Sequence, residues 1–91
     1  MPELTIFTKD PDAVLDYVWD WTSWLGDDTI ATTTITAADG ITVDSSATVG
    51  PLVTVWLSGG TAGTTYPVTC RITTDGGRTE DRTSRFIVME R

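Results

Sequence analysis

Histidine does not occur in this 91-residue chain, and cysteine occurs once, as Cys70. Because histidine is the commonest general base and the commonest transition-metal ligand in proteins, its absence argues against an enzyme or a zinc-type site. One cysteine cannot form an internal disulfide, so the fold does not depend on an oxidising compartment. Cys70 falls on the apolar side of an alternating segment and has no histidine to activate it, which indicates a buried thiol.

Basic residues are also scarce, with 6 Lys and Arg against 13 Asp and Glu and a formal net charge of -7. Nucleic acid and anionic membranes are therefore poor partners, because both require a basic surface. Lys9 is the only basic residue before Gly50, whereas later in the chain arginines roughly balance the acids. The acidic half is either a solvated surface or a face that docks onto a basic partner or a neighbouring copy.

Long apolar runs are missing as well, and the first residues lack the basic and apolar regions of a signal peptide, so we expect a soluble protein. Gly59–Gly63 lacks the spacing and the following lysine of a phosphate-binding loop. The aspartates from Asp10 to Asp20 lack the glycine and the final glutamate of a calcium loop, although Asp27 and Asp28 could still hold calcium. We therefore expect no catalytic residue, no cofactor and no metal.

Strands, in contrast, are indicated throughout by alternating apolar and polar residues and by β-branched runs, with turn signals every ~8–12 residues. The expected strands are Leu4–Phe7, Asp16–Trp21, Thr29–Thr36, Ile41–Asp44, Leu52–Ser58, Thr64–Thr74 and Arg78–Met89. This pattern, without a convincing helix, predicts one all-β domain over residues 1–91, an immunoglobulin-like antiparallel β-sandwich. Residues 1–12 could act as an N-terminal arm, and a small open barrel is the alternative architecture.

The apolar positions of these strands form the expected core: Ile30, Ile35, Ile41, Val43, Val53, Val55, Leu57, Val68, Cys70, Ile72, Phe86 and Val88. Ser45–Thr48 is polar, which is typical of a loop or a sheet edge. Tyr66 stands at the start of the penultimate strand, where such sandwiches often place a corner tyrosine. It could equally be an ordinary half-buried strand aromatic.

Tryptophan is concentrated in the segment Asp12–Leu25, which contains three of the four in the chain. Within Leu15–Trp21 the odd positions are large and apolar and the even positions are Asp, Val and Asp, the pattern of a strand with one apolar face. We interpret the segment as a protein-contact surface in which aromatic anchors supply affinity and carboxylates supply register. Its expected contact residues are Asp12, Asp16, Tyr17, Trp19, Asp20, Trp21 and Trp24.

Two other roles remain open for the tryptophans. All of them could pack in or on the core, or an exposed indole could stack on a sugar. Trp56 lies on the opposite side of its strand from the neighbouring apolar residues, so either both faces of that strand are covered or Trp56 is exposed.

Several segments occur in a characteristic order along the chain: Lys9–Tyr17, Trp19–Leu25, Asp28–Ala31, Val55–Thr69 and Arg71–Arg82. In this order they resemble a family of small tailed-bacteriophage virion proteins, usually called fiber–tail adaptors or virion structural proteins. The long run from Trp56 to Arg78 is the specific part of the resemblance. The sequence departs from the family pattern at Val18, where a small residue is expected.

The resemblance implies a non-enzymatic immunoglobulin-like module, present in several copies per virion and assembled in the host cytoplasm. Its implied partners are other virion proteins, including further copies of itself, and neither nucleic acid nor a membrane. The implied role is an adaptor that joins tail and fiber components. A capsid decoration protein is the alternative within the virion, and a carbohydrate-binding module is an alternative of another class.

Overall fold

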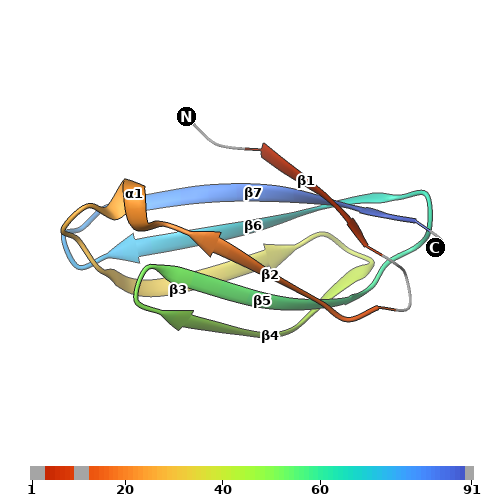
Figure 1. Ribbon diagram of the computed structural model, residues 1–91, viewed down its shortest axis with the longest axis horizontal. Helices are drawn as coiled ribbons and strands as arrows, with labels where there is room; N and C mark the ends of the chain where they lie inside the picture. Colours follow the sequence, from red (N-terminus) through yellow and green to blue (C-terminus); the bar gives the residue numbers. More distant parts are fainter. Residues whose placement is uncertain (1–3, 10–12, 90–91) are drawn as a thin grey trace.

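The computed structural model describes the backbone of residues 4–9 and the whole of residues 13–89, which form two sheets packed face to face (Figure 1). One sheet contains, in order, β1 (Leu4–Lys9), β7 (Thr79–Val88), β6 (Thr65–Thr74) and β3 (Ile30–Ala37). The other sheet contains, in order, β2 (Leu15–Asp20), β5 (Leu52–Gly59) and β4 (Ile41–Val49). These seven strands of the described residues confirm the predicted immunoglobulin-like sandwich, and two separate sheets replace the alternative barrel.

One strand pair departs from the expected antiparallel arrangement. β1 runs parallel to β7, with Leu4 opposite Thr83 and Lys9 opposite Val88, whereas the other pairs of described strands are antiparallel. Parallel pairing is possible because the chain crosses to the other sheet after β1, so no tight turn has to join β1 to β7. Residues 4–9 of the predicted N-terminal arm therefore form an edge strand.

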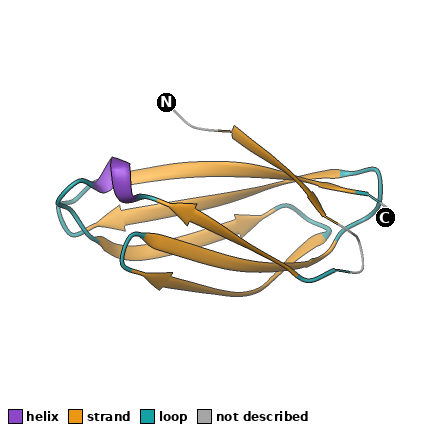
Figure 2. Cartoon of the chain, viewed as in Figure 1, coloured by secondary structure: helices purple, strands orange, loops and turns teal. Residues whose placement is uncertain are grey.

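A single helical turn, α1 (Thr22–Leu25), lies between the expected strands Asp16–Trp21 and Thr29–Thr36, where the sequence shows no convincing helix (Figure 2). The Asp20 carboxylate accepts hydrogen bonds from the amide of Thr22, at 2.9 Å, and from its hydroxyl, which fixes the start of the turn. Gly26 ends it with a φ of 61° and donates its N–H to the Thr22 carbonyl.

A third difference is the length of β4, which continues through the stretch expected to be loop or edge and ends at Val49. A bulge between Val43 and Ser45 interrupts its register with β5, and pairing then resumes. Because β4 is an edge strand whose residues 44–49 are exposed on both sides, no apolar alternation marks this half of the strand in the sequence.

The core lies between the two sheets and contains Trp19, Trp21, Leu25, Ile41, Val53, Val55, Leu57, Tyr66, Val68, Cys70, Ile72, Phe86 and Val88. Of the expected core residues, Ile30, Ile35 and Val43 are half-buried at the margin and the others are buried. The additional members include two tryptophans. Since burial of one large apolar side chain contributes roughly 1.5–3 kcal/mol, they strengthen a core that is small for an isolated domain.

Tyr66 adopts the corner arrangement, which decides between its two predicted roles. Its ring is 5% exposed, and its hydroxyl accepts a hydrogen bond of 2.8 Å from the amide N–H of Thr61, five residues upstream. The ring lies against two glycines with positive φ, Gly40 and Gly60. A Cβ at Gly40 would lie 2.8 Å from the tyrosine Cε1, so the corner requires glycine there.

Candidate protein interface

The predicted contact residues lie on different sides of the segment formed by residues 13–25. Apolar side chains turn toward the core and carboxylates turn toward solvent, as the alternation predicts. The inward or buried residues are Tyr17, Trp19 and Trp21; Trp24 is half-buried; Asp16 and Asp20 are exposed; and Asp12 lies outside the described residues.

Trp19 joins the two sheets from inside the sandwich. It is 2% exposed, and its indole N–H donates a hydrogen bond of 3.2 Å to the hydroxyl of Ser84 on β7. The Ser84 hydroxyl in turn donates to the hydroxyl of Tyr17 at 3.2 Å, and the rings of Tyr17 and Trp19 pack edge to face at 4.9 Å. Trp19 is therefore placed in the core and is not an exposed anchor.

Trp21 closes the same end of the core and is fully buried. The Arg82 guanidinium lies 4.2 Å from the centre of its ring and donates to the backbone carbonyl of Asp20 at 2.8 Å, so a cation covers the indole. Cys70 is buried in the same core, as predicted. Burial raises the pKa of the Cys70 thiol to about 11, so the thiol stays protonated at neutral pH.

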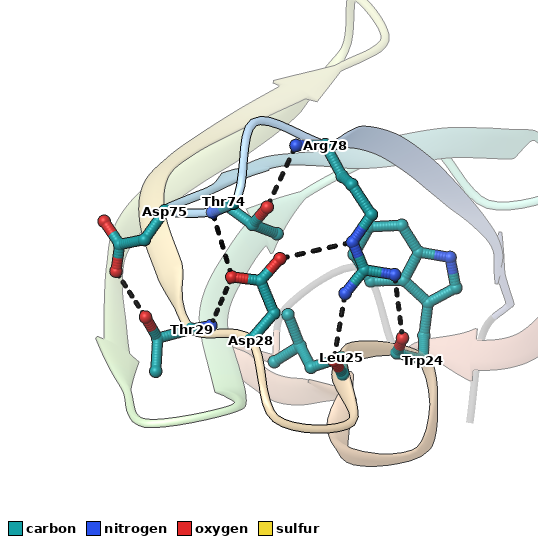
Figure 3. A network of polar contacts seen from close by, with 8 residues as sticks. Trp24, Leu25, Asp28, Thr29, Thr74, Asp75 and Arg78 are labelled. Atoms are coloured by element: carbon teal, nitrogen blue, oxygen red, sulfur yellow. Dashed lines mark hydrogen bonds and ion pairs between the residues drawn. The ribbon is translucent and has the colours of Figure 1, made fainter.

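Trp24 belongs to a polar network that ties α1 to the turn between β6 and β7 (Figure 3). The guanidinium of Arg78 lies 4.2 Å from the centre of the Trp24 ring. It donates to the backbone carbonyls of Trp24 at 3.3 Å and Leu25 at 2.9 Å, and to the Asp28 carboxylate at 3.2 Å. Arg78 thus satisfies carbonyls that one helical turn leaves free, and its guanidinium packs on the ring of the half-buried Trp24.

Asp28 is the acceptor at the centre of this network. Hydrogen bonds, the largest contribution coming from the Thr74 hydroxyl, lower the pKa of Asp28 to about 2. The amides of Thr29 and Gly76 also donate to one of its oxygens, at 2.9 and 3.0 Å. Its carboxylate therefore has a structural role in joining two loops. Among the described residues, no group of three or more Asp, Glu, Cys or His side chains could hold a metal ion.

A hollow of about 200 Å³ lies beside this network, between α1 and the turn that joins β4 to β5. Its lining is mainly apolar and consists of Thr22, Leu25, Gly26, Asp28, Thr29, Gly50 and Pro51. The Trp21 amide donates to the Pro51 carbonyl at 3.0 Å and fixes one wall. The hollow is large enough for one side chain of a partner, but it is smaller than the ~300–1,000 Å³ typical of small-molecule sites.

The outer face of the β2–β5–β4 sheet carries most of the exposed large apolar side chains in the described chain. They are Val18 (42% exposed), Val49 (72%), Leu52 (40%) and Trp56 (36%). The strand register arranges the face in three rows: Asp16–Trp56–Ser45, Val18–Thr54–Ala47 and Asp20–Leu52–Val49. We call this surface, together with Asp44, the acidic face. Scattered apolar residues are normal on a surface, but a group gathered on one sheet indicates a contact site.

Carboxylates frame these apolar residues without a cation from the same sheet. Asp16 lies directly opposite Trp56, and the Asp44 carboxylate accepts a hydrogen bond of 2.7 Å from Ser58. The sequences of β2, β4 and β5 contain no lysine or arginine. The sequence alone indicates that Trp56 faces away from its apolar neighbours. Only the register shows that it meets Asp16.

The outer face of the opposite sheet is different, because its polar side chains pair with one another. Hydroxyl pairs join Thr69 to Thr83 at 2.8 Å and Thr73 to Thr79 at 3.3 Å. Between them Arg71 makes a two-pronged ion pair with Asp81, at 2.7 and 3.1 Å. A face whose groups are satisfied by each other has less to gain from a partner than the acidic face.

The chain matches a known protein family over most of its length. The family model described as "Podophage GP4 fiber-tail adaptor protein gp77" matches residues 9–86. No curated protein matches the chain. Over the part of the chain that the structure describes, no helix has the length and apolar character needed to cross a membrane.

Proposed function

Because this chain belongs to the podophage GP4 fiber-tail adaptor family, we propose that it joins tail and fiber components through its acidic face. The family match supports a virion structural protein with other virion proteins as partners. The observation that carries the finer proposal is the group of exposed apolar side chains around Trp56, framed by Asp16 and Asp44 on one sheet.

The partner that fits this face has an apolar pocket surrounded by lysine or arginine. Trp56 fills the pocket and supplies affinity, since tryptophan is enriched among the few residues that dominate interfaces. The carboxylates of a chain with a net charge of -7 accelerate encounter with a basic surface and exclude acidic competitors. The hollow beside α1 extends this surface, because Gly50 and Pro51 in its lining connect Val49 to Leu52.

Replacement of Trp56 tests the proposal without disturbing the core, because Val53, Val55 and Leu57 occupy the inner side of β5. We expect Trp56→Ser to remain folded and to weaken binding to purified tail or fiber proteins of the same phage by about 30-fold, the effect of losing a ~2 kcal/mol anchor. Met89→Ser is the matched control, since Met89 is exposed but does not belong to the acidic face. Binding is measured by surface plasmon resonance, and the fold by circular dichroism.

A Trp56→Ser variant that binds as tightly as the wild type would refute the role of this face. Asp16→Asn combined with Asp44→Asn should mainly slow association, and the difference from wild type should shrink as salt is raised. Binding to purified capsids in place of tail and fiber proteins would favour the alternative role of capsid decoration.

A further inference from the structure

The edge strands of the two sheets differ in how they are protected. Edge strands expose unpaired N–H and C=O groups, and proteins usually protect them with charges, prolines or bulges. β1 carries Lys9, β2 carries Asp16 and Asp20, and β4 carries Asp44. β3, with the sequence Ile-Ala-Thr-Thr-Thr-Ile-Thr-Ala, carries neither a charge nor a proline.

The position of the β-bulge also differs between β3 and β4, an edge strand of the other sheet. In β4 the bulge lies at Asp44, within the strand. In β3 the irregularity lies between Ile30 and Thr32, and from Thr32 to Ala37 the pairing with β6 is unbroken. On its other side, no strand of the described residues pairs with β3. This stretch is therefore a regular, uncharged edge whose outward backbone groups pair with no strand of the described residues, although the Thr33 hydroxyl contacts that of Thr48 on β4 at 2.9 Å.

The outward side chains of this edge are self-complementary. Thr32, Thr34 and Thr36 are exposed and lie on the same outer face as Thr73, Arg71 and Thr69, their partners on β6. Threonine pairs already join β6 to β7 across this face. A row of three threonines can pair with an identical antiparallel row in the same way.

Charge favours a second copy at this edge over other places on the molecule. Each chain has a net charge of -7, so two copies repel wherever carboxylates meet. Among the edge strands of the described residues, β3 carries no charge of either sign, whereas β1, which also lacks carboxylates, carries Lys9. The neighbouring Arg71 is already neutralised by Asp81.

We propose that two copies of this chain associate through antiparallel pairing of β3 with β3, with Thr34 of one copy opposite Thr34 of the other. The four-stranded sheets of the two copies then form one continuous sheet about a two-fold axis. The acidic face lies on the other sheet and stays accessible in this dimer. The inference therefore stands or falls separately from the proposed contact with tail or fiber.

Sedimentation velocity of the full chain over a range of concentrations tests the dimer, at ~0.15 M ionic strength to screen the net charge. We expect the wild type to dimerise, and we expect Thr34→Lys and Thr34→Glu each to weaken the dimer by at least about tenfold, because like charges then meet at the axis. An equimolar mixture of the two variants should form a heterodimer, since the opposite charges pair. Thr65→Lys is the matched control, because Thr65 is an exposed threonine on β6, away from the edge.

Each other outcome overturns the proposal. The proposal is wrong if the wild type stays monomeric up to millimolar concentration. It is also wrong if Thr34→Lys dimerises like the wild type, or if Thr65→Lys weakens the dimer as much as Thr34→Lys does. A mixture of the two Thr34 variants that fails to form a heterodimer would also reject the stated register. Circular dichroism establishes that each variant is folded, so loss of the dimer cannot be confused with unfolding.

Discussion

Removal of the Ser84 hydroxyl should reveal how firmly Trp19 is built into the core. Ser84 is 1% exposed and Trp19 is 2% exposed, and the hydrogen bond of 3.2 Å between them joins β7 to β2 across the sandwich. Ser84→Ala leaves the buried indole N–H without its acceptor, which costs roughly 1–3 kcal/mol. With ~4–8 °C lost per kcal/mol in a domain of this size, a central cost of ~2 kcal/mol lowers the Tm by about 8–16 °C.

A double-mutant cycle with Trp19→Phe separates this hydrogen bond from general damage to the core. Trp19→Phe removes the N–H and leaves a cavity, so it destabilises by itself, but Ser84→Ala should then cost much less than in the wild type. Free energies of unfolding are measured by urea titration, with the exposed Ser45→Ala as the control, expected within ~0.5 kcal/mol of wild type. If the destabilisation of the double variant equals the sum of the two single variants to within ~0.3–0.5 kcal/mol, the reasoning is refuted. That result would mean that Trp19 and Ser84 do not interact.

Two further substitutions test the ends of the sandwich. Because the pKa of Asp28 is lowered from 3.8 to about 2, the unfolded chain binds the proton first as pH falls through this window, and the wild type loses stability there. In Asp28→Asn the free energy of unfolding, measured by urea titration, should therefore fall less steeply with decreasing pH over the same range. Equal pH dependence in the variant and the wild type would contradict the lowered pKa of Asp28. At Gly60 an added Cβ would lie 2.6 Å from Val88 Cγ2, whereas Gly63, which also has positive φ, has open space. The free energy of unfolding of Gly60→Ala should consequently be about 1–3 kcal/mol lower than that of Gly63→Ala, which is the cost of overpacking. Gly60→Ala should therefore melt at a lower temperature, and equal melting temperatures would exclude a rigid corner.

The fold was predictable because alternation and turn residues act locally. β5 and β6 show apolar side chains at every second position, and their inner residues, such as Val55 and Cys70, are those that the pattern indicates. β4 was predicted too short, since an edge strand that is exposed on both sides has no alternation to reveal it. The parallel pairing of β1 with β7 depends on where the chain crosses between sheets, which no local pattern records.

The candidate interface was predictable only in part, because its residues come from separate strands. The sequence indicates which residues share a side of β2, but it does not decide whether Trp19 is covered by its own chain or by a partner. Trp56 lies opposite Asp16 only because β2 pairs with β5 in a particular register, and the two residues are 40 positions apart in the sequence. The contact between Arg78 and Asp28 likewise joins residues 50 positions apart. Long-range pairings of this kind follow from packing the two sheets and leave no periodic signal.

The parallel pairing of β1 with β7 also decides how this small domain responds to mechanical tension. A pull along the chain enters β1 at Leu4 and β7 at Val88, which lie at opposite ends of the paired strands (Figure 1). The force then acts along the strands and shears their hydrogen bonds together, whereas an antiparallel hairpin pulled at its ends would open one bond at a time. A load applied to the two ends of this strand pair is therefore resisted by several hydrogen bonds at once, although the core that stabilises the domain is small.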